Sequence, residues 1–257
     1  RIALGLGSAL LVLVLARYLA LSSNFWDLGV FLNSHFNLAP EWQRAFYGHA
    51  QPLMLIWGGI YQTLSVAWAP LALVGAQALV LLGSVVAIWR VFGPWPGLAM
   101  LLYYPLWVNA LFDFHFDHLA IPLLAAFFIG CERQRYAMAT LAAALLVLVK
   151  EPFALQTLAC GLYFGWLAIS PRHRGYHRRL IILATLLVVW GAVWFYGVTH
   201  WVLPYFTDGM RGGLDAGAFS WLGKSLTDIM WTLVSRPGWI LSEILGTPGK
   251  LVYLAVL

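Results

Sequence analysis

The sequence has few charged residues. Lys, Arg, Asp and Glu together make up 10% of its 257 residues. Soluble domains carry about 25% of such residues, so the composition argues against a soluble fold. Basic residues outnumber acidic ones by 15 to 10, which gives a net charge of +5. In a membrane protein this excess usually belongs to cytoplasmic loops, so we expect no nucleic-acid partner.

Cysteine is scarce as well. Cys131 and Cys160 fall at or inside apolar segments, and they provide neither a disulfide framework nor metal-ligand spacing. The apolar segments also lack the alternation of transmembrane β-strands. Hydrophobic residues instead make up 62% of the chain, in runs that approach the roughly 20 residues needed to cross a bilayer. The expected fold is therefore an all-α, polytopic transmembrane helical bundle.

The sequence predicts a single transmembrane domain over residues 1–257. We expect it to be part of a longer protein, because it begins at Arg1 without Met and ends inside an apolar run. Two of the predicted spans, His118–Gly130 and Tyr136–Val149, are short for a bilayer. The candidate spans are Ile2–Leu21, Pro70–Val91, Trp95–Phe112, His118–Gly130, Tyr136–Val149, Phe153–Ile169, Leu180–Val202 and Trp239–Leu257.

The basic loop Pro171–Arg179 predicts the orientation, because positively charged loops stay in the cytoplasm. A secondary interpretation of this loop is contact with anionic lipid. Arg1 falls on the same side only if Pro52–Trp68 lies in the outer interface without crossing. The Asp and His residues of the polar links then collect on the outer side. A helical stripe after Val202 predicts an outer amphipathic helix, through Phe219, Leu222, Leu226, Ile229 and Leu233.

The link Asp113–His118 reads DFHFDH and holds four ionisable groups between two apolar runs. Asp113 and Asp117 share a face if the link is helical. Asp and His side chains suit a divalent metal ion or the handling of a phosphate-bound proton, and His115 and His118 are candidates with the two aspartates. The alternative is a short polar link whose aromatic side chains snorkel to the interface.

Four further residues have a structural and a functional interpretation each. Asp27 follows the first span and is either a helix cap or a carboxylate at the rim of a cavity. Lys150 and Glu151 are either an ion pair at a helix end or a phosphate-binding lysine held by its neighbour. Arg17 is either a snorkelling anchor or a phosphate ligand.

Several motifs carry a resemblance to a known family. They are WDLGVF at Trp26–Phe31, LFDFHFDHLAIPLL at Leu111–Leu124 and LVKEPFAL at Leu148–Leu155, with GHAQPLMLIWGGIY at Gly48–Tyr61. In this order they resemble a bacterial family of predicted membrane proteins with DLG-aromatic, HFSP-like, FDFHxE-like and VKED-like motifs. That family is similar to the GT-C integral-membrane glycosyltransferases. The HFSP position here begins at His49, and Pro152 replaces the last residue of VKED.

The resemblance implies a GT-C-like bundle with interfacial helices on the outer face of the bacterial inner membrane. It also implies a polyprenyl-phosphate sugar donor that enters from the lipid, with Asp27 as the catalytic carboxylate. Lys150 and Arg17 are then candidates for binding the donor phosphate. The supporting or possible metal-binding residues are Asp113, His115, Asp117, His118, Glu151 and His49, with a divalent cation as the possible cofactor.

Two functions therefore stay open at this point, and a transporter is a weaker third, because the polar cluster suits a site at the membrane surface better than one at the midplane. One is a membrane glycosyltransferase that moves a sugar from a polyprenyl-phosphate donor. The other is a non-catalytic integral membrane subunit with a GT-C-like fold, packed against other membrane proteins in a larger complex. The 14 Trp residues suit both, because aromatic side chains anchor helices in membranes and also build interfaces.

Overall fold

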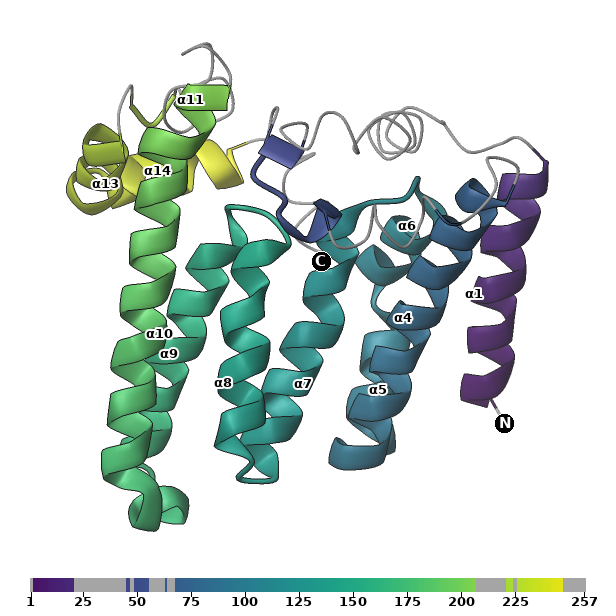
Figure 1. Cartoon of the computed structure of the whole chain (residues 1–257), viewed down its shortest axis with the longest axis horizontal. Helices are drawn as coiled ribbons and strands as arrows, with labels where there is room; N and C mark the ends of the chain where they lie inside the picture. The colour runs from purple at the N-terminus through teal and green to yellow at the C-terminus, as the bar shows by residue number, and fades with distance from the viewer. Residues whose placement is uncertain are drawn as a thin grey trace.

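The computed structural model describes residues 2–20, 45–46, 49–55, 63, 68–206, 221–223 and 226–246. Every regular element within these ranges is helical, and they contain no β-strand. Figure 1 shows the long helices side by side, with their axes roughly parallel. The chain is therefore an up-and-down helical bundle over the part that the structure describes.

The first half of the chain builds one side of the bundle. Its elements are α1 (Ile2–Leu19), α4 (Ala69–Phe92), α5 (Pro94–Leu102), α6 (Tyr104–Leu111) and the 3₁₀ turn η2 (Phe116–Leu119). The second half builds the other side. Its elements are α7 (Ala120–Glu132), α8 (Tyr136–Leu145), η3 (Leu146–Leu148), α9 (Phe153–Ile169), η4 (Pro171–Tyr176), α10 (His177–Gly197), the π-helical turn η5 (Val198–Val202), α11 (Leu203–Phe206), α13 (Leu226–Ser235) and α14 (Pro237–Leu245).

The predicted span Trp95–Phe112 is not one helix. It is broken at Tyr103, which has an extended ψ of 110° between α5 and α6. Pro105 explains the break, because it has no backbone N–H to donate to the carbonyl of Leu101. The indole of Trp107 takes that role, with its Nε1 donating to the Leu101 oxygen at 2.6 Å. The carbonyl of Leu101 therefore keeps a hydrogen-bond donor despite the break in the helix.

The two ends of the bundle differ in chemistry. We call one the polar end; there α1 ends, α4 begins, and the links Phe112–Phe116 and Val149–Pro152 lie (Figure 1). We call the other the arginine-rich end; there α1 begins, α7 ends and η4 connects α9 to α10. The arginine-rich end holds Arg90, Arg133, Arg135, Arg172, Arg174, Arg178 and Arg179.

α1 ends and α4 begins at the same end of the bundle, the polar end (Figure 1), as the predicted topology requires. The start of α1 and the basic loop lie together at the arginine-rich end, as predicted. Of the proposed surface helix Pro52–Trp68, only 52–55, 63 and 68 are described, so its path lies outside the described residues.

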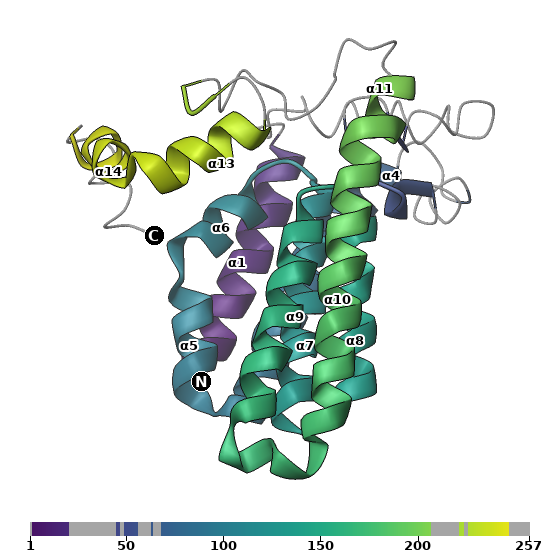
Figure 2. The same cartoon turned by 90° about the vertical axis from the view of Figure 1, so that its left-hand side faces the viewer.

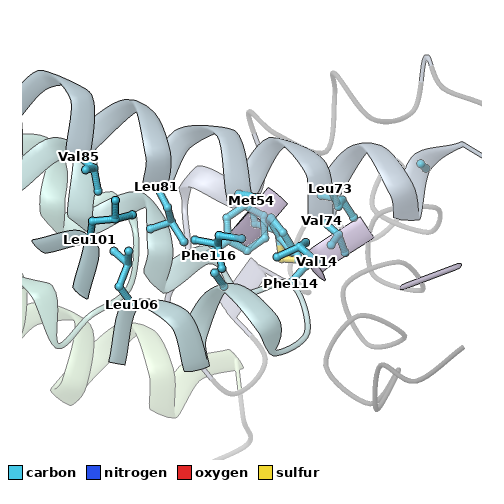
Figure 3. Close-up of a cluster of buried hydrophobic side chains, with 14 of the residues drawn as sticks. Val14, Met54, Leu73, Val74, Leu81, Val85, Leu101, Leu106, Phe114 and Phe116 are labelled. Carbon is cyan, nitrogen blue, oxygen red and sulfur yellow. The ribbon is translucent and has the colours of Figure 1, made fainter. Parts of the chain in front are cut away.

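Two apolar cores fill the bundle. The first joins α1, α4, α5 and α6, and Figure 3 shows the side chains of Leu81, Val85, Leu101 and Leu106 in contact within it. The second joins α7, α8, α9 and α10 around the fully buried rings of Phe127 and Phe164.

Among the described residues, two helical segments are long and apolar enough to cross a membrane, Ala69–Phe92 and Pro171–Phe206. The other helices are shorter. α7 has 13 residues, which is about 20 Å against a hydrocarbon core of about 30 Å. This agrees with the short spans expected from the sequence. Many large apolar side chains on the sides of the bundle are exposed, among them Leu141, Leu162 and Val193.

The helices after α11 run across the bundle. Figure 2 shows α13 at the polar end, at a steep angle to the bundle helices. Its 10 residues are too few to cross a bilayer, which agrees with the predicted amphipathic helix. The predicted stripe is less regular than expected. Leu222 precedes the helix, Leu233 is exposed, and Phe219 lies outside the described residues. α14 ends at Leu245, and the rest of the predicted last span is not described.

The contact between α9 and α10 yields a packing test. A Cβ at Gly191 would lie 2.5 Å from the carbonyl oxygen of Ala154 and 3.0 Å from the backbone nitrogen of Leu158. We expect Gly191→Ala to force the helices apart and to cost about 1–3 kcal/mol, as overpacking does. The matched control is Gly165→Ala on α9, where nothing lies within 4 Å of the added Cβ.

The measurement is thermal unfolding of the purified protein in detergent. Gly165→Ala should leave the midpoint unchanged or raise it, because alanine favours helix by up to about 1 kcal/mol over glycine. Equal midpoints for the two variants would contradict the close helix contact.

Candidate functional site

The link Asp113–His118 is fixed by two buried aromatic rings. Phe114 and Phe116 are 1% and 0% exposed, and their rings meet edge to face with centroids 5.1 Å apart. Figure 3 shows both rings inside the first core, near Met54 and Leu73. The interpretation of these aromatics as snorkelling side chains was therefore wrong. They anchor the link, whose polar residues are His115 between the two rings and Asp113, Asp117 and His118 on either side of them.

The link is also not helical where a helical face was predicted. His115 has extended backbone angles, φ −140° and ψ 133°, and η2 begins only at Phe116. Asp113 and Asp117 therefore do not share a helical face. Asp113 is 1% exposed, whereas the side chain of Asp117 is 40% exposed. The two carboxylates lie in different environments.

Gln77 of α4 binds the backbone of the link Asp113–His118 and of the preceding helix through its side-chain amide. Its Oε1 accepts a hydrogen bond from the backbone N–H of His115 at 2.9 Å, and its Nε2 donates to the carbonyl of Asn109 at 3.4 Å. Gln77 is 3% exposed. Sequence reasoning missed this residue. The available signal was its position, as a side-chain amide inside the apolar run Ala69–Phe92.

His118 presents a free ring nitrogen. Its Nδ1 lies 2.8 Å from the carbonyl oxygen of His115. A carbonyl can only accept, so Nδ1 carries the proton and the neutral ring has its lone pair on Nε2. Burial lowers the pKa of His118 below its ordinary value, which favours this neutral form. Nε2 is buried and has no hydrogen-bond partner in the part of the chain that the structure describes.

Asp117 and Lys150 form an ion pair between two links. Lys150 Nζ lies 3.3 Å from Asp117 Oδ2, and the lysine side chain is only 15% exposed. The second oxygen of Asp117, Oδ1, is buried without a hydrogen-bond partner among the described residues. The ion pair therefore engages only one of the two carboxylate oxygens of Asp117.

Glu151 ties a third segment to the same region. Its Oε1 lies 2.7 Å from His49 Nδ1, and its Oε2 accepts the backbone N–H of Ala50 at 2.9 Å. Ala50 is fully buried, whereas the His49 side chain is 46% exposed. Lys150 and Glu151 thus pair with residues of different links, Asp117 and His49. The sequence had also suggested an ion pair between Lys150 and Glu151 themselves, and the structure does not form that pair.

A pocket of about 450 Å³ opens beside these groups. Its walls differ in polarity. His115, Asp117 and His118 provide the titratable wall, and the remaining lining is apolar apart from Asn109. The apolar lining residues are Phe112, Ala120, Ile121, Leu124 and Phe153.

The other candidate residues lie apart from this pocket or outside the description. Asp113 is buried and its two oxygens have no hydrogen-bond partner among the described residues, but it does not line the pocket. Arg17 lies in the last turn of α1, near the polar end, and is also absent from the lining. Asp27 lies outside the described residues. Lys150 does not line the pocket either and is joined to it through its ion pair with Asp117, and Glu151 and His49 are likewise absent from the lining.

The metal hypothesis finds no geometric support in the described part of the chain. No three His, Cys, Asp or Glu side chains are placed there so that they could share one metal ion. The candidate ligands were Asp113, His115 and Asp117, with His118, Glu151 and His49 as further possible ligands. The first three do not converge because the backbone of the link is extended, so that Asp113 is buried while Asp117 is partly exposed.

Comparison with known protein families matches residues 17–257 to the family described as "Predicted membrane protein (DUF2079)". The chain belongs to this family. No curated protein and no solved structure matches it. The family description agrees with the two helices that are able to cross a membrane. It names no activity, so the functional argument for this family member rests on the geometry of the polar end.

The anchor role of Glu151 is testable. Glu151→Ala should leave the buried N–H of Ala50 without its acceptor, which costs about 1–3 kcal/mol. The control is Glu132→Ala at the arginine-rich end, where the lost ion pair with Arg172 is exposed and is worth less than about 1 kcal/mol. Thermal unfolding in detergent compares the two. If Glu151→Ala lowered the unfolding midpoint less than Glu132→Ala does, the carboxylate of Glu151 would not be what holds His49 and Ala50 in place.

Proposed function

We propose that this protein is a GT-C-like membrane glycosyltransferase that moves a sugar from a polyprenyl-phosphate donor, with its site at the polar end. The observation that carries the proposal is the pocket with one titratable and one apolar wall, beside the paired Lys150 and Asp117. In this proposal the helical bundle is embedded in the bacterial inner membrane. The polar end faces outward, because the arginine-rich end is cytoplasmic by the distribution of positive charge.

The two walls suit the two parts of an amphiphilic donor. A lipid-linked sugar phosphate has an anionic headgroup and a long apolar chain. Ile121, Leu124 and Phe153 offer an apolar surface for the chain near the phosphate. Lys150 does not itself line the pocket, but it pairs with Asp117 in the pocket wall and so offers a cation beside it. Its side chain is only 15% exposed, and charge interactions at such a site are stronger than in water.

The reaction is a single displacement at the anomeric carbon. The acceptor hydroxyl oxygen forms a bond to this carbon, and the bond from carbon to the phosphate oxygen breaks. The electron pair of that bond stays on the polyprenyl phosphate, whose charge Lys150 stabilises. The proton of the acceptor hydroxyl passes to a base, and the sugar configuration is inverted.

Two groups are candidates for the base. His118 is the described candidate, because its Nε2 has no hydrogen-bond partner among the described residues and burial lowers its pKa, which favours the unprotonated ring near neutral pH. Asp27 is the candidate that the family resemblance implies, and it lies outside the described residues. The resemblance also assigns phosphate binding to Arg17, which is near the polar end but does not line the pocket.

The test is sugar transfer by the purified full chain in nanodiscs, with a panel of polyprenyl-phosphate sugars as donors. His118→Asn keeps a side-chain N–H for the His115 carbonyl but removes the free Nε2. We expect His118→Asn to lower the rate of sugar transfer by about 10²–10⁴-fold, which is the usual contribution of a general base. Asp27→Asn tests the other candidate in the same assay. The matched control is His200→Asn, an exposed histidine outside the pocket.

The pH profile distinguishes the two bases. If His118 is the base, the rate falls as the pH drops through the pKa of His118, which burial places below the ordinary histidine value, because the ring becomes protonated. If Asp27 is the base, the rate stays constant through this range. A folded protein that transfers no sugar from any donor, and whose variants behave alike, would favour the non-catalytic membrane subunit instead.

A further inference from the structure

The arginine-rich end carries a large positive charge. Seven arginines lie there in the described part of the chain, and Glu132 is the one acidic residue among them, so the local charge is 7 − 1 = +6. Most of these arginines lie in turns or at helix ends. Such an excess of charge attracts anionic lipid headgroups, with about 1 kcal/mol for each cation near the membrane surface.

A small pocket lies within this end. It has a volume of about 180 Å³ and is formed between α7, α9 and η4, with Phe92 of α4 at its edge. Its polar lining includes Glu132, Tyr163, Ser170, Arg172 and His173. The volume suits a headgroup phosphate and its nearest atoms rather than a complete lipid.

The polar wall of this pocket is held in place. Arg172 donates two hydrogen bonds to Glu132, from Nη2 at 2.7 Å and from Nη1 at 3.1 Å. His173 is 4% exposed, and its Nδ1 lies 2.6 Å from the hydroxyl of Tyr136. η4 is thereby fixed to the first turn of α8 and to the last turn of α7. Arg172 keeps 58% of its side chain exposed, so it can contact a ligand.

An apolar track continues from the pocket along α9. Leu155, Leu162, Trp166 and Ile169 are each at least half exposed, and their spacing of seven, four and three residues places them on one helix face. Trp166 also lines the pocket. A molecule with a phosphate in the pocket and an acyl chain on this face would satisfy both surfaces.

We infer that this pocket binds the headgroup phosphate of an anionic phospholipid, with Arg172 and Ser170 as its polar ligands and an acyl chain on the outer face of α9. The inference uses the membrane location of the bundle but not the sugar-transfer activity. The aromatic rings of Phe128 and Trp166 flank the pocket and would contact the glycerol and upper chain. The apolar track points to a lipid rather than a free phosphate ion.

Glu132 gives the inference a sharp test, because it competes with the phosphate for Arg172. Removing Arg172 and removing Glu132 break the same ion pair, so both variants lose the same fold contact. Their effects on lipid binding should nevertheless be opposite. Arg172→Gln removes the phosphate ligand, whereas Glu132→Gln removes a negative charge from the pocket and frees the guanidinium.

The experiment counts the lipids that the purified full chain retains by native mass spectrometry, after addition of phosphatidylglycerol or phosphatidylcholine. We expect wild type to retain phosphatidylglycerol preferentially, Arg172→Gln to reduce this retention several-fold and Glu132→Gln to increase it. Arg178→Gln is the matched control, because this arginine lies at the same end but not in the pocket lining. It should have little effect.

Three results would overturn the inference. Equal losses for Arg172→Gln and Arg178→Gln would mean that the charge attracts lipid diffusely, without a pocket. Equal losses for Arg172→Gln and Glu132→Gln would mean that the pair is structural only. Displacement of the lipid by millimolar inorganic phosphate would identify a soluble anion as the ligand. None of these results depends on sugar transfer, so this inference and the proposed activity fail separately.

Discussion

The polar end depends on the burial of two aromatic rings. Phe114 and Phe116 are inserted into the first core, and this insertion fixes the backbone of the link between α6 and α7. Fully burying such a ring contributes about 1.5–3 kcal/mol, which is enough to hold an extended backbone that has no helix to support it. His115 is consequently placed where Gln77 binds its N–H, and its carbonyl is placed where His118 requires an acceptor.

The sequence predicted the helical bundle and its polarity well, because both follow from composition and charge. Apolar runs mark helices, and arginines between them mark one end. The break at Tyr103 was not predicted, although Pro105 could have indicated it, because proline cannot continue the hydrogen-bond pattern of a helix. The prediction of a single span from Trp95 to Phe112 failed because it weighed hydrophobicity alone.

The candidate site was only partly predictable. The ionisable residues were found, because such groups are rare in an apolar chain, but their pairing was not. Lys150 bonds to Asp117 across two links, and Glu151 bonds to His49 from a third. Such pairs depend on where separate helices end in space, which no local pattern encodes. The role of Gln77 escaped for the same reason, since its partner is a backbone N–H 38 residues away.

The central claim is that the pocket at the polar end holds the phosphate and the first isoprenoid units of a lipid-linked donor. Photo-crosslinking tests it directly, with a photoactivatable residue at Leu124 on the apolar wall or at Leu162 on the exposed face of α9. The account predicts that polyprenyl phosphate labels position 124 more strongly than position 162, and that Lys150→Gln abolishes this difference. Equal labelling at both positions, unchanged by Lys150→Gln, would contradict it.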